Sequence, residues 1–484
     1  MPVVSASSGA TRVPRVRITE SNRAWWTLAG ACMGLFMLML DSTVVTLALP
    51  AVREELDASA SQLQWVINAY LLALSVLVVT AGRLGDMFGR RRIFLLSLGI
   101  FSTGLVVAAL APSIEVLIAA RVIQGVGGAG MLTLSLAIVS NDFTDTERPR
   151  ALGIWAGISA LALALGPLLG GTLVEQLSWR WVFWIGVPPL IAGLWITARA
   201  ASESRDEGAG HRIDLPGVAL LTIGLGTIVL ALVQGNEWGW GSTQTIVTFV
   251  IGLLALGLFA IVDEHVRQPM VEFGLFRNRP YLGATAAAFC LVGGWWSVIF
   301  YMPQYLQEVL GYSPVMSGIM VLPITAPMVV ISPLCKWLIN RVGVRALMTT
   351  GMICGTAGIA LMTRLDASSG YATVLPGFLL FGIALGLVYT PMSTAAMAAM
   401  PRAKAGIAAG VLAMNRVMAG AVMLAVTGAL FAIFRDDAAG SDEVEAYTYA
   451  LSSSLWASVA LCAVGTVLTW WLVRPPQGDP ETPS

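Results

Sequence analysis

The sequence predicts an all-α integral membrane protein with fourteen transmembrane helices, and three observations support this fold class. Of its 484 residues, 57% are hydrophobic and only 12% are charged, which is about half the charged fraction of an ordinary soluble domain. The mean hydropathy of +0.78 is too high for a surface that faces water. Long apolar stretches recur along the chain, each near the ~20 residues that a helix needs to cross a bilayer.

These apolar stretches define the predicted helices. Eleven contain no charged residue, namely 58–82, 93–111, 151–174, 181–198, 215–233, 245–262, 282–302, 315–335, 346–363, 372–394 and 451–473. Three more contain one ionisable residue each, namely 24–49 with Asp41, 116–139 with Arg121 and 405–434 with Arg416. The longest connections, 199–214 and 435–450, are too short for a soluble domain, so we expect the function to lie within the membrane.

Lysine and arginine are distributed unevenly between the two sides that fourteen spans define. Alternate connections, starting from the N-terminal tail, contain 22 of these cations, whereas the opposite connections contain only Arg53, Arg180, Arg364 and Arg435. By the positive-inside rule, the tails 1–23 and 474–484 are both predicted to be cytoplasmic. The first apolar stretch is too long for a signal peptide, so we expect it to be a retained span. The chain is therefore predicted to be a multi-pass protein of the cell inner (cytoplasmic) membrane, with the lipid bilayer as its surroundings.

Several function classes are disfavoured. Lys plus Arg equals Asp plus Glu at 28 each, so no net basic field is available to attract a nucleic acid. The five cysteines stand singly in apolar runs and the two histidines are far apart, so we expect no disulfide and no metal site. Three scattered intramembrane charges supply no catalytic cluster, so we expect no enzyme. The phosphate-binding pattern of ATPases is absent, and we expect no cofactor.

The connection after the second stretch, Gly82 to Arg92, contains three glycines, one acid and four arginines. Gly82 and Gly89 permit a tight turn and close helix approach, while Asp86 can cap a helix or pair with an arginine such as Arg90. A contact of this kind can be made and broken, which favours a role in conformational gating. The alternative is a simple topology signal, which would need only the positive charges.

Asp41 and Arg121 are candidates for a functional site because an ionisable residue in the hydrocarbon is costly. Each lies about 9–15 Å from the same end of its span, so the two can occupy the same depth. Gln124 shares a helix face with Arg121. Burial disfavours an ionised carboxylate and a nearby guanidinium favours it, so the proton occupancy of Asp41 can change as a cavity opens to either side. The alternative is a static pair that only neutralises itself.

The fifth span contains two pairs of glycines four residues apart, Gly153 with Gly157 and Gly166 with Gly170. Such pairs permit close helix packing, and Pro167 frees a backbone carbonyl, so we expect a bend there. A packing motif without any role in transport is the alternative.

A weaker set of candidates is predicted to line a substrate cavity: Gln124, Asn415, Arg416, Tyr389 and Trp295. Arg416 either favours anionic or zwitterionic substrates or caps a neighbouring helix, and the sequence leaves both readings open. Aromatic residues in a bundle mostly serve packing or face lipid.

The sequence resembles the major facilitator superfamily, on four motifs. The segment Gly82 to Arg92 resembles its G-x-L-a-D-r-x-G-R-R loop, and Arg121-Val122-Ile123-Gln124-Gly125 resembles its fourth-span R-x-x-Q-G motif. Leu40 to Pro50 resembles the first-span motif of the fourteen-helix drug:proton antiporters, with Thr46 where asparagine is usual. The fifth-span glycines resemble the antiporter motif of that branch, with Ala162 where a glycine often stands.

The resemblance implies two pseudo-symmetric six-helix bundles, at 24–200 and 282–473, with the linker and an inserted helix pair at 201–281. A shift of 254 residues aligns the loop motif with 336–345 and places Gly343 on Gly89, which is a degenerate second copy. The resemblance also implies that Asp41 and Arg121 couple transport to protons, and that the fifth-span motif distinguishes exporters from uptake carriers.

The function expected from these observations is proton-coupled efflux of lipophilic or amphiphilic small molecules by alternating access, with a monomer as the working unit. The main alternative is a dedicated exporter of one endogenous metabolite, such as an antibiotic, a siderophore or a lipid. A sodium-coupled carrier, an uptake carrier and a non-transporting receptor are further alternatives, although a receptor would more naturally carry a soluble domain.

Overall fold

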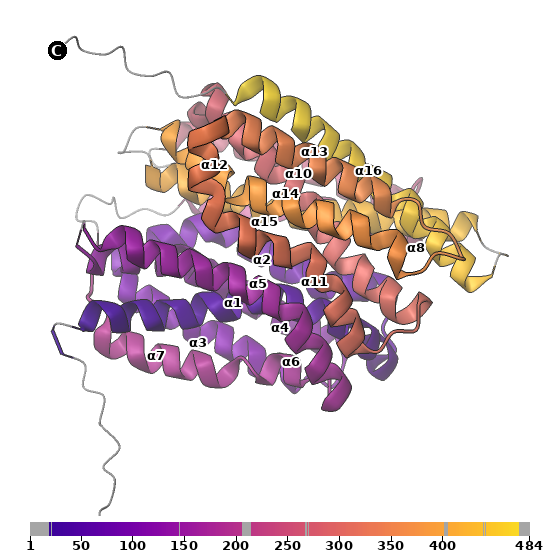
Figure 1. The fold of residues 1–484 in the computed structure, drawn as a ribbon, viewed down its shortest axis with the longest axis horizontal. Coiled ribbons are helices and arrows are strands. Elements are labelled where there is room, and N and C mark those ends of the chain that lie inside the picture. The colour runs from indigo at the N-terminus through magenta and orange to yellow at the C-terminus, as the bar shows by residue number, and fades with distance from the viewer. Residues whose placement is uncertain are drawn as a thin grey trace, which may run out of the picture.

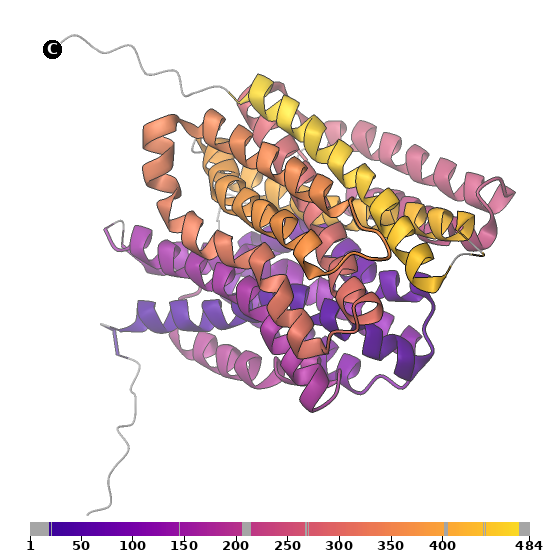
Figure 2. The same ribbon diagram turned by 45° about the vertical axis from the view of Figure 1, so that its right-hand side comes forward.

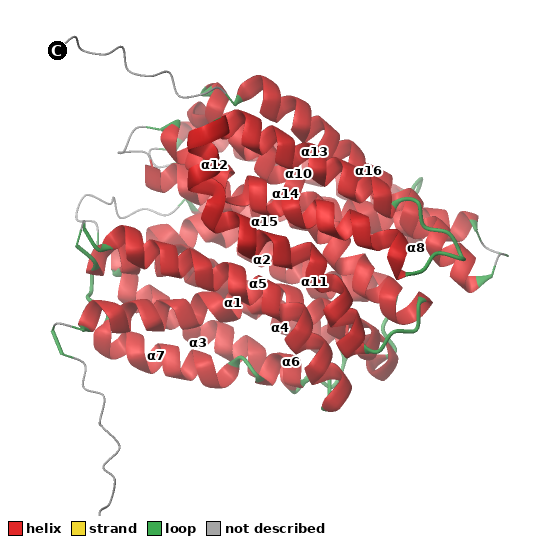
Figure 3. Cartoon of the chain, in the orientation of Figure 1, coloured by secondary structure: helices red, strands yellow, loops and turns green. Residues whose placement is uncertain are grey.

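The computed structural model describes residues 19–473, apart from 21, 145, 206–213, 267–268, 270, 401–404, 439 and 441. Among these residues every regular element is a helix (Figure 3), and fourteen helical spans are long and apolar enough to cross a membrane. The chain is therefore a multi-pass membrane protein with 14 spans, as the apolar stretches predict. The tail 474–484, most of the tail 1–23 and parts of the segment 201–281 lie outside the described residues.

The helices follow one another with short connections. The first six spans are α1 Arg23–Leu56, α2 Ala60–Phe88, α3 Arg90–Ala109, α4 Ile114–Asp142, α5 Arg148–Gln176, and α6 Trp181–Trp184 with α7 Val187–Ala200. A helical hairpin follows, formed by α8 Leu215–Trp238 and α9 Thr243–His265. The last six spans are α10 Arg279–Gln304 with η1 Phe273–Arg277 before it and η2 Tyr305–Val309 after it, α11 Pro314–Ile331 with η3 Ser332–Leu334 and α12 Cys335–Val342, α13 Val344–Met362, α14 Tyr371–Ala398, α15 Ala405–Asp437 and α16 Glu443–Leu472.

Two glycines form corresponding turns in the first and last thirds of the chain. Gly89 separates α2 from α3 with a φ of 109°, and Gly343 separates α12 from α13 with a φ of 81°. A residue with a Cβ adopts such angles only with strain, so glycine is required at both turns. The sequence shift that aligns Gly89 with Gly343 therefore corresponds to a repeated local structure.

The prediction of a loop over 435–450 is wrong for most of its length. α15 continues to Asp437 and α16 already begins at Glu443. The first turn of α16 is polar, so it does not appear among the apolar stretches of the sequence. Asp442 caps it by accepting a hydrogen bond from the Val444 amide, and Glu443 and Glu445 face the positive end of the helix dipole.

The helices α1–α7 lie on one side of the molecule and α10–α16 on the other (Figures 1 and 2). The contacts between the two groups run mainly along α5 with α11 and α2 with α15. The hairpin packs beside this second seam, because α8 contacts both α2 and α15. Its second helix, α9, packs on α8 and exposes large apolar side chains such as Leu253, Leu254 and Ile261, which suits a surface in contact with lipid.

The start of α1 and the end of α16 lie at the same end of the bundle (Figure 1). We call this end the terminal face, and the other end, at which α1 is joined to α2, the opposite face. The turn at Gly89 lies at the terminal face, because α2 returns to it after α1 has crossed.

Candidate functional site

Asp41 and Arg121 form an ion pair in the middle of the first group of helices. Asp41 lies on α1 and Arg121 on α4, and the Arg121 Nη1 atom donates a hydrogen bond of 2.6 Å to the Asp41 Oδ2 atom. Their exposed side-chain fractions are 3% and 0%, so water does not screen the pair. The structure thus brings together the two charges that the sequence places at the same depth in the membrane.

Three further groups complete this charge network. Gln124 donates from Nε2 to the Asp41 Oδ1 atom over 3.1 Å and accepts from Arg121 Nη1 over 3.0 Å. The Arg121 Nε atom donates to the Val66 carbonyl of α2 over 2.9 Å. The ring of Tyr70, one turn further along α2, lies 4.3 Å from the Arg121 Cζ atom, in cation–π contact. Arg121 therefore ties together α1, α2 and α4.

A central cavity of about 110 Å³ lies between the two groups of helices. Side chains from α1, α2, α4 and α5 line one wall, and side chains from α10, α11, α14 and α15 line the other. Most of the lining is apolar, with a few hydroxyls, two indole rings and one guanidinium. This kind of lining is typical of a small-molecule site, but the volume is smaller than the roughly 300–1,000 Å³ of most such sites.

The structure separates the candidates for this cavity. Trp295, Tyr389 and Arg416 line it, whereas Gln124 belongs to the charge network. Asn415 is not in the lining, because its Nδ2 atom donates to the Thr285 carbonyl of α10 over 2.7 Å. The prediction for Asn415 is therefore corrected. Successive helical residues point about 100° apart, so the neighbour of a cavity-facing arginine faces another helix.

Tyr70 connects the charge network to the cavity. It stacks on Arg121 and is itself part of the lining. Met39 and Ser42, which flank Asp41 on α1, also line the cavity. One side chain, that of Tyr70, therefore lies between the charge pair and a molecule bound in the cavity. Sequence reasoning missed Tyr70, because an aromatic residue in an apolar span carries no distinguishing signal.

The glycine pairs of α5 behave differently at its two ends. A Cβ atom at Gly170 would lie 2.9 Å from the Val44 carbonyl of α1, and one at Gly166 would clash with Thr43. On another side of α5, the Pro167 carbonyl packs directly against Gly318 of α11. In contrast, Gly153 and Gly157 have no described atom within 4 Å of such a Cβ atom. Only the pair near the opposite face serves close packing in this conformation, which corrects the expectation for Gly153 and Gly157. The helix continues through Pro167 without interruption.

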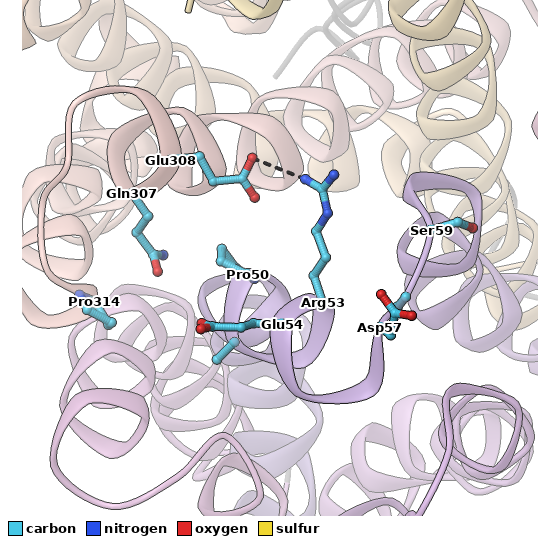
Figure 4. A pocket seen from close by; sticks show the side chains of 10 residues that line it. Pro50, Arg53, Glu54, Asp57, Ser59, Gln307, Glu308 and Pro314 are labelled. Atoms are coloured by element: carbon cyan, nitrogen blue, oxygen red, sulfur yellow. Dashed lines mark hydrogen bonds and ion pairs between the residues drawn. The ribbon is translucent and has the colours of Figure 1, made fainter. Parts of the chain in front are cut away.

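Polar contacts between the two groups of helices gather at the opposite face. A pocket of about 770 Å³ lies there. Arg53 of α1 and Glu308 of η2 point toward one another in it (Figure 4), and the Arg53 Nη1 atom lies 3.4 Å from the Glu308 Oε2 atom. Next to it, the Gln307 Nε2 atom donates to the Leu47 carbonyl over 3.3 Å. Glu175 at the end of α5 accepts a hydrogen bond of 2.8 Å from the Val315 amide of α11.

A fourth contact, 3.4 Å from the Gln64 Nε2 atom to the Tyr301 hydroxyl, lies one turn deeper. Among the described residues, no hydrogen bond or ion pair joins α1–α7 to α10–α16 near the terminal face. The bundle is therefore held shut at the opposite face. Sequence reasoning counted Arg53 only as a loop cation and missed this pairing, because the partners are 255 residues apart.

The segment Gly82 to Arg92, predicted as a connection, is helical on both sides of Gly89, and the segment after α7 holds it at the terminal face. Asp86 accepts a hydrogen bond from the Arg90 Nε atom over 2.9 Å and forms an ion pair with the Arg90 Nη2 atom over 2.8 Å. The Arg90 amide donates to the Ser204 carbonyl over 2.9 Å, and the Glu203 carboxylate accepts from the Arg91 amide over 3.1 Å. Gly82 has only one described atom, the Thr133 Cβ, within 4 Å of its Cβ position. Glu203 is a partner that the sequence did not indicate.

Within the described residues, no group of three or more His, Cys, Asp and Glu side chains is placed to hold a metal ion.

The sequence matches the family model of the Major Facilitator Superfamily over residues 31–424. It is 35% identical over 407 residues to the multidrug resistance protein Stp of Mycobacterium tuberculosis, covering 84% of this chain and 75% of that protein. It is 34% identical over 414 residues to the tetracenomycin C resistance and export protein of Streptomyces glaucescens, covering 85% and 76%. Among solved structures, a D-xylose-proton symporter superposes with a TM-score of 0.67 at 14% identity, covering 94% of this chain and 99% of that one, which shows a shared fold.

Proposed function

The chain belongs to the major facilitator superfamily, and from that membership we propose that it exports lipophilic or amphiphilic drugs across the cytoplasmic membrane in exchange for protons. Relatives named for multidrug resistance and for antibiotic export support the efflux direction. We further propose that both termini are cytoplasmic and that a single chain is the working unit. The uneven distribution of lysine and arginine supports this orientation.

The observation that carries the proton-coupling proposal is the buried Asp41–Arg121 pair beside the central cavity. An ionised Asp41 neutralises Arg121 at a depth where an unpaired charge is costly. Protonation of a carboxylate oxygen of Asp41 removes that compensation, and Arg121 is left with the Val66 carbonyl and Gln124 as acceptors. The contact between α1 and α4 therefore depends on the proton, and α1 also forms part of the cavity wall.

The gating proposal treats residues 24–200 and 282–473 as two bundles that rock about the cavity. With the terminal face in the cytoplasm, the described conformation is closed toward the outside by Arg53 with Glu308 and by the close packing of α5 on α11. Opening to the outside breaks these contacts. The ion pair between Asp86 of α2 and Arg90 of α3 is proposed to hold the cytoplasmic ends of these two helices together during the movement.

The test is drug-driven proton movement in proteoliposomes. Wild type is compared with Asp41→Asn, and Glu443→Gln serves as the matched control because Glu443 also pairs with an arginine but is 86% exposed. We expect a proton signal from wild type and the control, and none from Asp41→Asn. Full retained coupling in Asp41→Asn, from protein shown to be folded in the liposomes, would reject Asp41 as the proton site.

A dedicated exporter of one endogenous metabolite is the second candidate, and the relative named for a single compound, tetracenomycin C, favours it. The same liposomes distinguish the two candidates by breadth. A signal from many unrelated lipophilic compounds supports multidrug export, whereas a signal from one chemical scaffold supports the dedicated exporter.

A further inference from the structure

Arg416 is a cation in the central cavity, and none of the described residues is an anionic partner for it. It lies on α15, and its guanidinium Cζ atom is 5.1 Å from the ring centre of Tyr389 on α14. Among the described residues, no carboxylate lies within ion-pair distance of it and no hydrogen bond joins it to a helix C-terminus. Capping of a neighbouring helix, the structural role open from sequence, is therefore not what holds Arg416 in place.

The lining of the cavity leaves this charge uncompensated. None of the lining residues is an aspartate or a glutamate, and the polar groups besides Arg416 are hydroxyls and indoles. Asp41, next to the lining residue Ser42 on α1, already accepts hydrogen bonds from Arg121 and Gln124 on its two oxygens. A lone guanidinium in an apolar cavity attracts an anion more strongly than the same group in water.

Four aromatic rings share the cavity with the guanidinium. Trp295 and Trp296 of α10, Tyr70 of α2 and Tyr389 of α14 all line the same cavity. Both tryptophans are buried, with exposed fractions of 7% and 6%. Large rigid rings bind flat aromatic surfaces with little loss of conformational entropy.

We propose that this cavity selects cargo that carries an anionic group on an aromatic body, with the anion on Arg416 and the body against Trp295, Trp296 and Tyr389. This inference rests on the proposed export function and narrows its substrate class. The binding step needs no proton transfer, so it can be tested apart from coupling.

The first experiment measures binding of two xanthene dyes to the purified protein by fluorescence anisotropy. Fluorescein is anionic at neutral pH, whereas tetramethylrhodamine methyl ester has a similar ring system and a positive charge. We expect wild type to prefer fluorescein and Arg416→Gln to lose at least about tenfold in fluorescein affinity, which is the size of one lost charge-assisted contact. Arg341→Gln is the matched control, because Arg341 makes the same kind of contact with Trp337, which is 53% exposed at the surface. Equal affinities for both dyes in wild type would overturn the proposal.

The second experiment measures the electrostatic potential of the cavity in the absence of a cargo. A cysteine replaces Ser42 in the lining, and its reaction rates with sulfonatoethyl and trimethylammonioethyl methanethiosulfonate are compared. We expect the anionic reagent to be favoured, and Arg416→Gln to reduce its rate advantage by about tenfold. An unchanged ratio would overturn the proposal even if neither dye binds.

Failure of this inference is distinguishable from failure of the export function. Coupled transport of the cationic dye, with no effect of Arg416→Gln, would leave export intact and reject the anionic cargo. Charge-selective binding without any proton-coupled movement would support the cavity and reject the antiporter.

Discussion

Arg121 and Arg416 lie well inside their spans, and their surroundings differ. Arg121 is fully buried, bonded to Asp41, Gln124 and the Val66 carbonyl, and stacked on Tyr70. Arg416 is partly exposed to the central cavity and contacts only one aromatic ring among the described residues. The first arginine is compensated by the protein itself, whereas the second is available to a molecule that enters the cavity.

The two roles that we propose for these arginines follow from this difference. A compensated pair changes its energy when its own carboxylate gains a proton, which is why we assign the Asp41–Arg121 pair to proton coupling. An uncompensated cation changes its energy when a ligand supplies the anion, which is why we assign Arg416 to cargo. Tyr70 contacts Arg121 and lines the cavity that contains Arg416, and it is the direct route by which one role can influence the other.

The largest effect is expected from breaking the compensated pair. Asp41→Ala leaves Arg121 as an uncompensated buried charge, which is expected to lower the free energy of unfolding by about 3–5 kcal/mol. Denaturant titration of the detergent-solubilised protein measures this. The double variant Asp41→Ala with Arg121→Leu removes both charges and should recover most of the loss. Equal losses in the single and the double variant would show that the pair is not compensated in the way the geometry indicates.

The next effect tests the link between the two arginines. Tyr70→Ala removes the ring that covers Arg121 and part of the cavity wall, and is expected to reduce drug-driven proton movement by about tenfold, the equivalent of ~1.4 kcal/mol of coupling. Tyr70→Phe keeps the ring and should retain coupling. Liposome proton flux, with and without drug, is the measurement. If Tyr70→Phe fails as Tyr70→Ala does, the hydroxyl and not the ring carries the link.

The compensated arginine was predictable from sequence, and the available one was not. Asp41 and Arg121 are single charges at matching depths of two long apolar spans. Because an unpaired charge in the hydrocarbon is costly, their positions alone suggest a pair. Arg416 is equally visible as a charge, but its direction depends on how α15 is rotated against α10 and α14. Adjacent residues of a helix point in different directions, so Arg416 faces the cavity while its neighbour Asn415 faces α10.

The same limit applies to the fold. The fourteen spans follow from runs of apolar residues, whereas the polar first turn of α16 does not, because only its cap and its acidic residues mark it. Glu203 and Glu308 were not identified as partners, since their arginines are distant in sequence and each pair forms only when helices assemble.

A smaller effect is expected from a third arginine, which is paired but not buried. Arg53 and Glu308 lie 3.4 Å apart at the opposite face, with side-chain exposures of 41% and 25%. A double-mutant cycle with Arg53→Gln and Glu308→Gln is expected to give a coupling of about 0.2–1 kcal/mol that decreases at high salt. A salt-independent coupling above this range would mean that the closed face excludes water more completely than these exposures indicate.

The smallest effect on stability is expected at the arginine that faces the cavity. Arg416→Gln removes a cation–π contact but also removes an uncompensated charge from an apolar site, and these opposing contributions should leave the free energy of unfolding within about 0.5 kcal/mol of wild type. Arg121→Gln is the matched comparison, because the same substitution there leaves Asp41 unpaired and should cost several times more. Denaturant titration of both variants gives the two values side by side. A large loss in Arg416→Gln would mean that the protein itself uses this charge for stability, and the cation would then no longer be free for cargo.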